Sequence, residues 1–68
     1  LREVRKRVNS LERRMQTLEG KIAQAQDEQA QADPSDYVAL GEIQERIAQL
    51  QKDLGDLEEE WLEASELL

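Results

Sequence analysis

The residues of this chain that could carry out chemistry are almost all charged. Its 68 residues contain 16 acids and nine bases but no His and no Cys, which excludes imidazole and thiolate chemistry and the metal sites built from them. No Ser has a general base in reach, and the chain has no P-loop and no glycine-rich loop that could cradle a phosphate. We therefore predict no catalytic, cofactor-binding or metal-binding residues.

An acidic run near the C-terminus is the nearest approach to a cation site. Glu58, Glu59 and Glu60 are consecutive, and Glu63 and Glu66 follow them. On an α-helix, successive side chains point about 100° apart, so these carboxylates would spread around the helix instead of converging on one ion. We interpret the run as a solvated acidic face.

A basic block near the N-terminus is the most suggestive functional feature. Residues 1–21 contain seven bases and three acids, and the remaining residues contain two bases and thirteen acids, so their net charges are +4 and −11. Arg2, Lys6 and Arg13 are candidate contacts for a phosphate backbone because they fall at outward-facing helical positions. No aromatic residue is interleaved to stack on bases, so such binding would be non-specific and salt-sensitive. The alternative is that opposite charges neutralise each other between paired helices.

Two stripes of apolar residues, in steps of three and four, must position these charges. The first stripe runs Leu1, Val4, Val8, Leu11, Met15, Leu18, Ile22, Ala25, and the second runs Leu40, Ile43, Ile47, Leu50, Leu54, Leu57, Trp61, Ala64, Leu68. Their mean step of about 3.5 residues is the repeat of a coiled coil. We predict an all-α fold, a two-helix antiparallel coiled-coil hairpin, with helices over about 1–31 and 37–68 and a turn over about 32–36.

Three residues have predicted structural roles. Pro34 must end the first helix, because it lacks a backbone donor and disfavours helical geometry at Asp33. The second helix begins either with Asp33 as its N-cap and Pro34 at its first position, or later, at Ser35 or Asp36. We expect Tyr37 to pack its ring over the turn, and Trp61 to fill the seam at the open end of the hairpin.

Two pairing registers are compatible with the stripes. The tighter register sets Ile22 against Ile43 and Leu11 against Leu54. The looser register sets Ile22 against Leu50 and Leu11 against Trp61. The flanking pairs of the tighter register are the favourable Arg5–Glu58, Arg7–Glu60 and Arg14–Asp53 and the unfavourable Lys21–Arg46. Those of the looser register are the favourable Arg14–Glu60, Lys21–Asp53 and Glu28–Arg46 and the unfavourable Glu12–Glu58. Since each exposed pair contributes at most about 1 kcal/mol, the charges favour antiparallel pairing in both cases and do not select between them.

We interpret the chain as one small unit cut from a larger protein, because its first residue already belongs to the seam. A monomeric hairpin is the expected state, and a dimer of hairpins is the alternative. Leu62 and Leu67 lie outside the stripe and are where the added contact of such a dimer would fall. No apolar run approaches the ~20 residues of a membrane span, so we expect no membrane contact.

The segment DPSDYVALGEIQERIAQLQKDLGDLEEEWLEASELL resembles the C-terminal coiled-coil domain of ABC-F ATPases of the Uup-like group. In that family, a turn with Asp, Pro and an aromatic residue precedes a helix that ends in a Glu-rich stretch and a Trp. The matching positions here are Asp33, Pro34, Asp36, Tyr37, Glu60 and Trp61.

The resemblance implies a cytoplasmic parent protein with two upstream cassettes that use ATP, whereas this segment would bind no cofactor. It implies a non-catalytic arm that helps a bacterial ATPase to engage nucleic acid (rRNA or DNA) or the ribosome, in translation or in work with DNA. The basic start of the first helix would be the contact surface. The alternative function, from a different class, is a structural or oligomerisation hairpin in an unrelated cytoplasmic protein.

Overall fold

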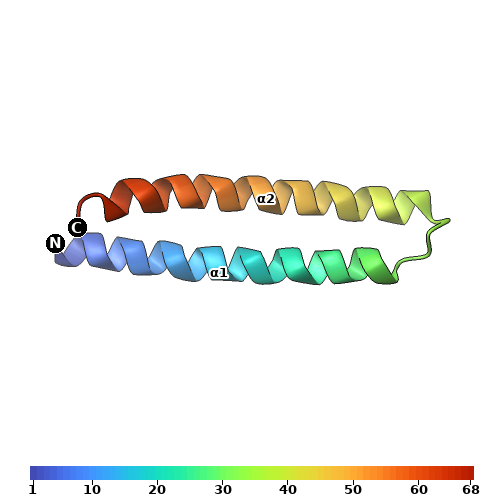
Figure 1. Ribbon diagram of the computed structural model, residues 1–68, viewed down its shortest axis with the longest axis horizontal. Coiled ribbons are helices and arrows are strands. Elements are labelled where there is room, and N and C mark those ends of the chain that lie inside the picture. The colour runs from blue at the N-terminus through green and yellow to red at the C-terminus, as the bar shows by residue number, and fades with distance from the viewer.

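The computed structural model describes all 68 residues and consists of two long helices joined by a short turn. Helix α1 spans Arg2–Gln31 and helix α2 spans Tyr37–Ser65, and the two run antiparallel side by side (Figure 1). The molecule is a rod of 53 × 14 × 11 Å, measured between Cα atoms. The predicted all-α hairpin is confirmed.

The turn is built by two aspartates. Ala32 is extended (φ −69°, ψ 152°), so α1 ends at Gln31, three residues before Pro34. The carboxylate of Asp33 then accepts hydrogen bonds from the backbone N–H and the hydroxyl of Ser35, at 2.9 and 2.8 Å. Asp36 is the N-cap of α2, since its carboxylate accepts from the backbone N–H of Ala39 at 3.1 Å. The prediction that Asp33 is the N-cap of the second helix is therefore wrong, because the Asp33 carboxylate is hydrogen-bonded to Ser35.

The hydrophobic core is a single thin seam between the helices. Its most buried cluster, which lies toward the open end, contains Val8, Leu11, Leu57 and Ala64. Val4, Met15, Leu18 and Trp61 pack against that cluster and remain partly exposed. Only six of the 68 residues are buried, and none of them is charged or polar. A seam this thin leaves little margin of stability to a chain of this size.

The looser of the two predicted registers is the one observed. The guanidinium of Arg46 donates to the carboxylate of Glu28 at 2.7 Å, a pair that only this register brings together. Val8, Leu11 and Ala64 belong to one buried cluster, which agrees with the looser register because that register sets Val8 against Ala64. One consequence is that the first turn of α2 projects past the end of α1 (Figure 1).

The ends of the two stripes do not join the seam. Leu1 is 76% exposed and Leu68 is 56% exposed, because the looser register leaves no facing residue to cover Leu1. Helix α2 also ends at Ser65, three residues before its predicted end. The last residues form a tighter turn, with the N–H groups of Leu67 and Leu68 bonded to the carbonyls of Ala64 and Ser65.

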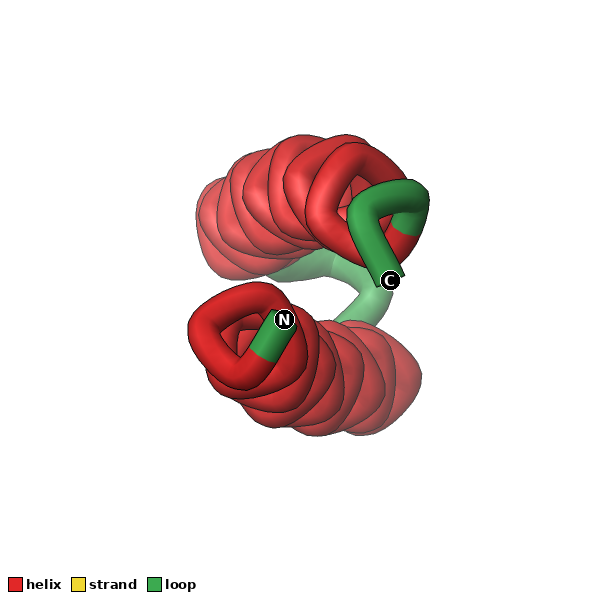
Figure 2. Tube along the Cα trace, turned by 90° about the vertical axis from the view of Figure 1, so that its left-hand side faces the viewer, coloured by secondary structure: helices red, strands yellow, loops and turns green.

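Seen end on, the helices are inclined to each other and both chain termini lie at the same, open end (Figure 2). This end of the rod therefore carries the basic N-terminal residues of α1 beside the acidic C-terminal residues of α2. Neither helix contains an apolar stretch of the length that crossing a membrane would require.

Candidate nucleic-acid interface

The three predicted contact residues share one face of α1. At about 100° per residue, Arg2, Lys6 and Arg13 fall within a narrow arc of the helix, opposite the apolar seam. All three side chains are exposed. The helical rise of about 1.5 Å per residue spreads them over ~17 Å, a length that spans several phosphates of a nucleic-acid strand. We call this surface the basic face.

None of the seven bases in residues 1–21 forms an ion pair. The two ion pairs of the molecule are Arg46–Glu28 at 2.7 Å and Lys52–Asp56 at 3.4 Å, and both lie outside that block. Of the three flanking pairs that favour the looser register, only Glu28–Arg46 closes; Arg14–Glu60 and Lys21–Asp53 do not. The predicted neutralisation across the helix pair is thus confined to one pair near the turn, and the basic block keeps its charge unpaired.

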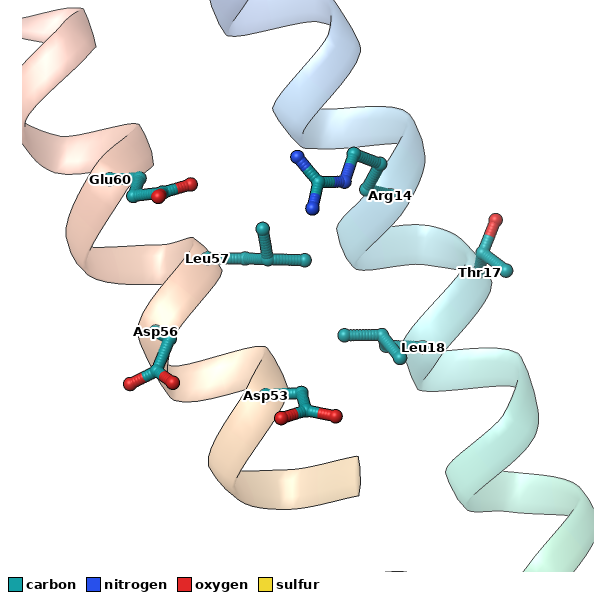
Figure 3. Close-up of a pocket in the computed structure, with 7 residues that line it drawn as sticks. All are labelled: Arg14, Thr17, Leu18, Asp53, Asp56, Leu57 and Glu60. Atoms are coloured by element: carbon teal, nitrogen blue, oxygen red, sulfur yellow. The ribbon is translucent and has the colours of Figure 1, made fainter. Parts of the chain in front are cut away.

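A shallow groove of about 450 Å³ runs between the helices near their middle. Arg14 and Thr17 line it from α1, and Asp53, Asp56 and Glu60 line it from α2, with Leu18 and Leu57 at its floor (Figure 3). The Arg14 guanidinium extends across the opening toward the α2 wall (Figure 3). Because that wall is acidic, the groove would repel a phosphate backbone.

Trp61 belongs to the seam and not to the basic face. Its ring packs against the core cluster, and it also borders a second hollow of about 270 Å³ with Glu12, Met15, Gln16 and Glu19. Its Nε1 is buried without a hydrogen-bond partner. The indole is therefore held by packing alone, and its position on the seam side leaves it out of reach of a base bound on the outer face of α1.

Pro34 lies in the turn, three residues past the end of α1. Tyr37, in contrast, is 79% exposed, so the prediction that its ring packs over the turn is wrong. The reason is the register, which carries the first turn of α2 beyond α1 and leaves no surface for the ring to cover. Sequence reasoning also missed the neighbouring Val38, which is 74% exposed. Its position outside the apolar stripe was the available signal.

The acidic run of α2 does not gather into a cation site. No three carboxylates anywhere in the structure lie close enough together to hold a metal ion. Asp33 is the one group with a shifted pKa: hydrogen bonds from the backbone N–H of Ser35, and secondarily from its hydroxyl, lower the pKa of the Asp33 carboxyl from its ordinary value of 3.8. The hydrogen bonds that cause this shift stabilise the turn, which lies at the opposite end of the rod from the basic face.

Comparison with protein families identifies the class. The chain matches the ABC transporter C-terminal domain over residues 2–66, nearly its whole length, and it belongs to that family. The resemblance to the C-terminal coiled-coil domain of ABC-F ATPases is confirmed at this level, and the hairpin is part of an ABC-type protein. No curated protein and no solved structure gave a significant match.

Proposed function

We propose that this hairpin is a non-catalytic C-terminal arm of an ABC-F-type ATPase, and that its basic face contacts a nucleic-acid backbone. The observation that carries the proposal is the unpaired state of Arg2, Lys6 and Arg13, which are exposed on one side of a rigid helix and have no carboxylate within ion-pair distance. Within the fold these charges have no partner, so an external polyanion would be their natural counterpart.

The geometry of the face favours backbone contact over sequence reading. Lys and Arg side chains on a helix can bind phosphates without touching base edges, and no aromatic ring is placed among them for stacking. The proposed partner is rRNA on the ribosome or DNA, contacted in the cytoplasm. The acidic α2 would keep the polyanion on the α1 side, which orients the arm against it. The ATP-binding cassettes of the parent protein would supply the hydrolysis.

The proposal can be tested by fluorescence anisotropy with labelled duplex RNA and DNA at low salt. A variant with Arg2→Gln, Lys6→Gln and Arg13→Gln should lose most binding. Three lost phosphate contacts should make the slope of log affinity against log salt shallower by about 2–3. The matched control carries Gln26→Glu, Gln44→Glu and Gln51→Glu, which reach the same net charge from exposed positions away from the basic face.

The control should bind more tightly than the basic-face variant. Equal losses in both variants would mean that only net charge matters, and unchanged binding in the basic-face variant would remove this surface from the proposal. Either result leaves the membership of the family intact.

A second candidate function is self-association, which exposed leucines at the open end favour. Leu62 is 54% exposed and Leu67 is 64% exposed, as predicted for the added contact of a dimer of hairpins. Because the chain belongs to an ABC family, a self-associating hairpin would still be part of an ABC-type protein and not of an unrelated one. Sedimentation of the chain at increasing concentration tests it, since a dimer held by these leucines should dissociate in the Leu62→Glu, Leu67→Glu variant.

A further inference from the structure

The tip of the hairpin, defined here as residues 33–42, exposes two large apolar side chains. Tyr37 and Val38 keep 79% and 74% of their surface in solvent. They lie in the first turn of α2, which projects past the end of α1, so nothing in the fold covers them (Figure 1). Folding gains little from either side chain, since neither is removed from water.

The charge around this pair has one sign. Residues 22–45 contain six acids and no base: Asp27, Glu28, Asp33, Asp36, Glu42 and Glu45. Only Glu28 is paired, with Arg46. The open end of the rod differs, because there the bases of α1 lie beside the acids of α2. Tyr37 and Val38, the two most exposed large apolar residues apart from Leu1, therefore lie in a segment that carries acids only.

We propose that the tip docks onto a protein surface on which Lys and Arg side chains surround an apolar pocket. The Tyr37 ring enters the pocket, its hydroxyl reaches the polar rim, and Val38 covers an adjacent apolar area. Asp33, Asp36 and Glu42 face the basic rim. This charge complementarity selects a basic protein as the partner and raises the rate of association. The proposal concerns the end opposite the basic face and does not depend on the proposed function.

Two other occupants fit the tip less well. Nucleic acid is repelled, because six acids and no base surround the apolar pair. A second copy of the chain offers bases on its α1, but Arg2, Lys6 and Arg13 enclose the polar Asn9 and no apolar pocket. A basic protein surface with an apolar centre satisfies both features of the tip.

The size of the tip fixes the kind of contact. The tip comprises only ten residues, 33–42, whereas each partner contributes about 20–30 residues to a stable interface. Docking is therefore transient and works as one contact among several. Since the rod is 53 Å long, the tip and the basic face engage distant sites.

The test uses the whole 68-residue chain, labelled for amide NMR, and a short helical peptide of Lys and Leu as the probe. The peptide should shift the amide signals of residues 33–42. The Tyr37→Ala, Val38→Ala variant, which removes only exposed side chains, should bind it about tenfold or more weakly. The matched control is Leu62→Ala, which removes a half-exposed apolar side chain within the acidic part of the open end and should leave the affinity unchanged.

Four results would overturn the proposal. One is a shift of the signals of residues 53–66 in place of those of the tip, and another is a tip variant that binds as tightly as the parent chain. A peptide of Lys and Ser that binds equally well would show that charge alone is sensed. Tip signals that shift with chain concentration, or with duplex RNA, would assign the tip to a second copy or to nucleic acid.

Discussion

Arg46 and Glu28 form the only ion pair that joins the two helices, with 2.7 Å between the guanidinium nitrogen and the carboxylate oxygen. The pair lies near the turn, and only the looser register brings its two side chains together. Both side chains are about half exposed, at 49% and 50%, so water screens much of their attraction. The pair marks the register more than it stabilises the fold.

We expect Glu28→Gln to lower the free energy of unfolding by less than about 1 kcal/mol, because exposed ion pairs contribute little. Urea unfolding followed by circular dichroism would measure it, and a double-mutant cycle with Arg46→Gln would isolate the pair. The effect should shrink as salt is added. A coupling well above 1 kcal/mol, or one insensitive to salt, would contradict this account of the pair.

Two of the mid-helix glycines should be replaceable with a gain in stability. No neighbouring atom lies within 4 Å of a Cβ added at Gly20 or Gly55, and neither residue has a positive φ. Replacing each by Ala should raise the free energy of unfolding by about 1 kcal/mol, through helix propensity. The same urea titration tests this, and the two gains should add. A loss of stability at either position would show that the helix bends there.

Core truncation should be costly for so thin a seam. Leu11 is only 3% exposed and belongs to the main buried cluster, so Leu11→Ala should cost about 2–5 kcal/mol and unfold much of the population. Leu62→Ala removes the same number of atoms from an exposed position and should leave stability within about 0.5 kcal/mol of the parent. Thermal melts of the two variants should differ clearly. Similar melts would place the core elsewhere.

The sequence predicted the helices, the turn and the antiparallel pairing, because the spacing of the stripes and Pro34 are strong local signals. It could not select the register, since the competing flanking pairs differ by tenths of a kcal/mol. The register determines which end residues are exposed. It leaves Leu1 without a facing residue and places Tyr37 beyond the end of α1, where it has no surface to pack against. For the candidate interface, the heptad repeat predicted that Arg2, Lys6 and Arg13 face outward. That these bases form no ion pair could be seen only from the positions of the side chains.

The N-cap of α2 should be the most sensitive polar position of the turn. The Asp36 carboxylate accepts from the Ala39 N–H at 3.1 Å, so Asp36→Ala leaves that donor to water and should cost about 1 kcal/mol. Asp36→Asn keeps an acceptor and should cost much less. Urea unfolding compares the two variants, and an equal loss in both would show that the charge, through the helix dipole, outweighs the hydrogen bond.

The Asp33–Ser35 turn should make part of the stability depend on pH. Hydrogen bonds from the Ser35 backbone N–H and hydroxyl lower the pKa of Asp33 in the folded chain from 3.8. A lowered folded-state pKa means that the stabilisation is complete above 3.8 and is lost as pH falls through the lower, folded value. Carboxyl-carbon NMR titration should show this pKa directly.

Ser35→Ala should raise the pKa of Asp33 only part of the way toward 3.8, because the variant loses the hydroxyl bond and keeps the stronger influence, the backbone N–H bond. Asp33→Asn accepts the same bonds without titrating, so its stability should lack this acid-dependent component. An unchanged Asp33 pKa in the Ser35→Ala chain would mean that the backbone bond alone sets the shift, and that the hydroxyl contributes nothing to the turn.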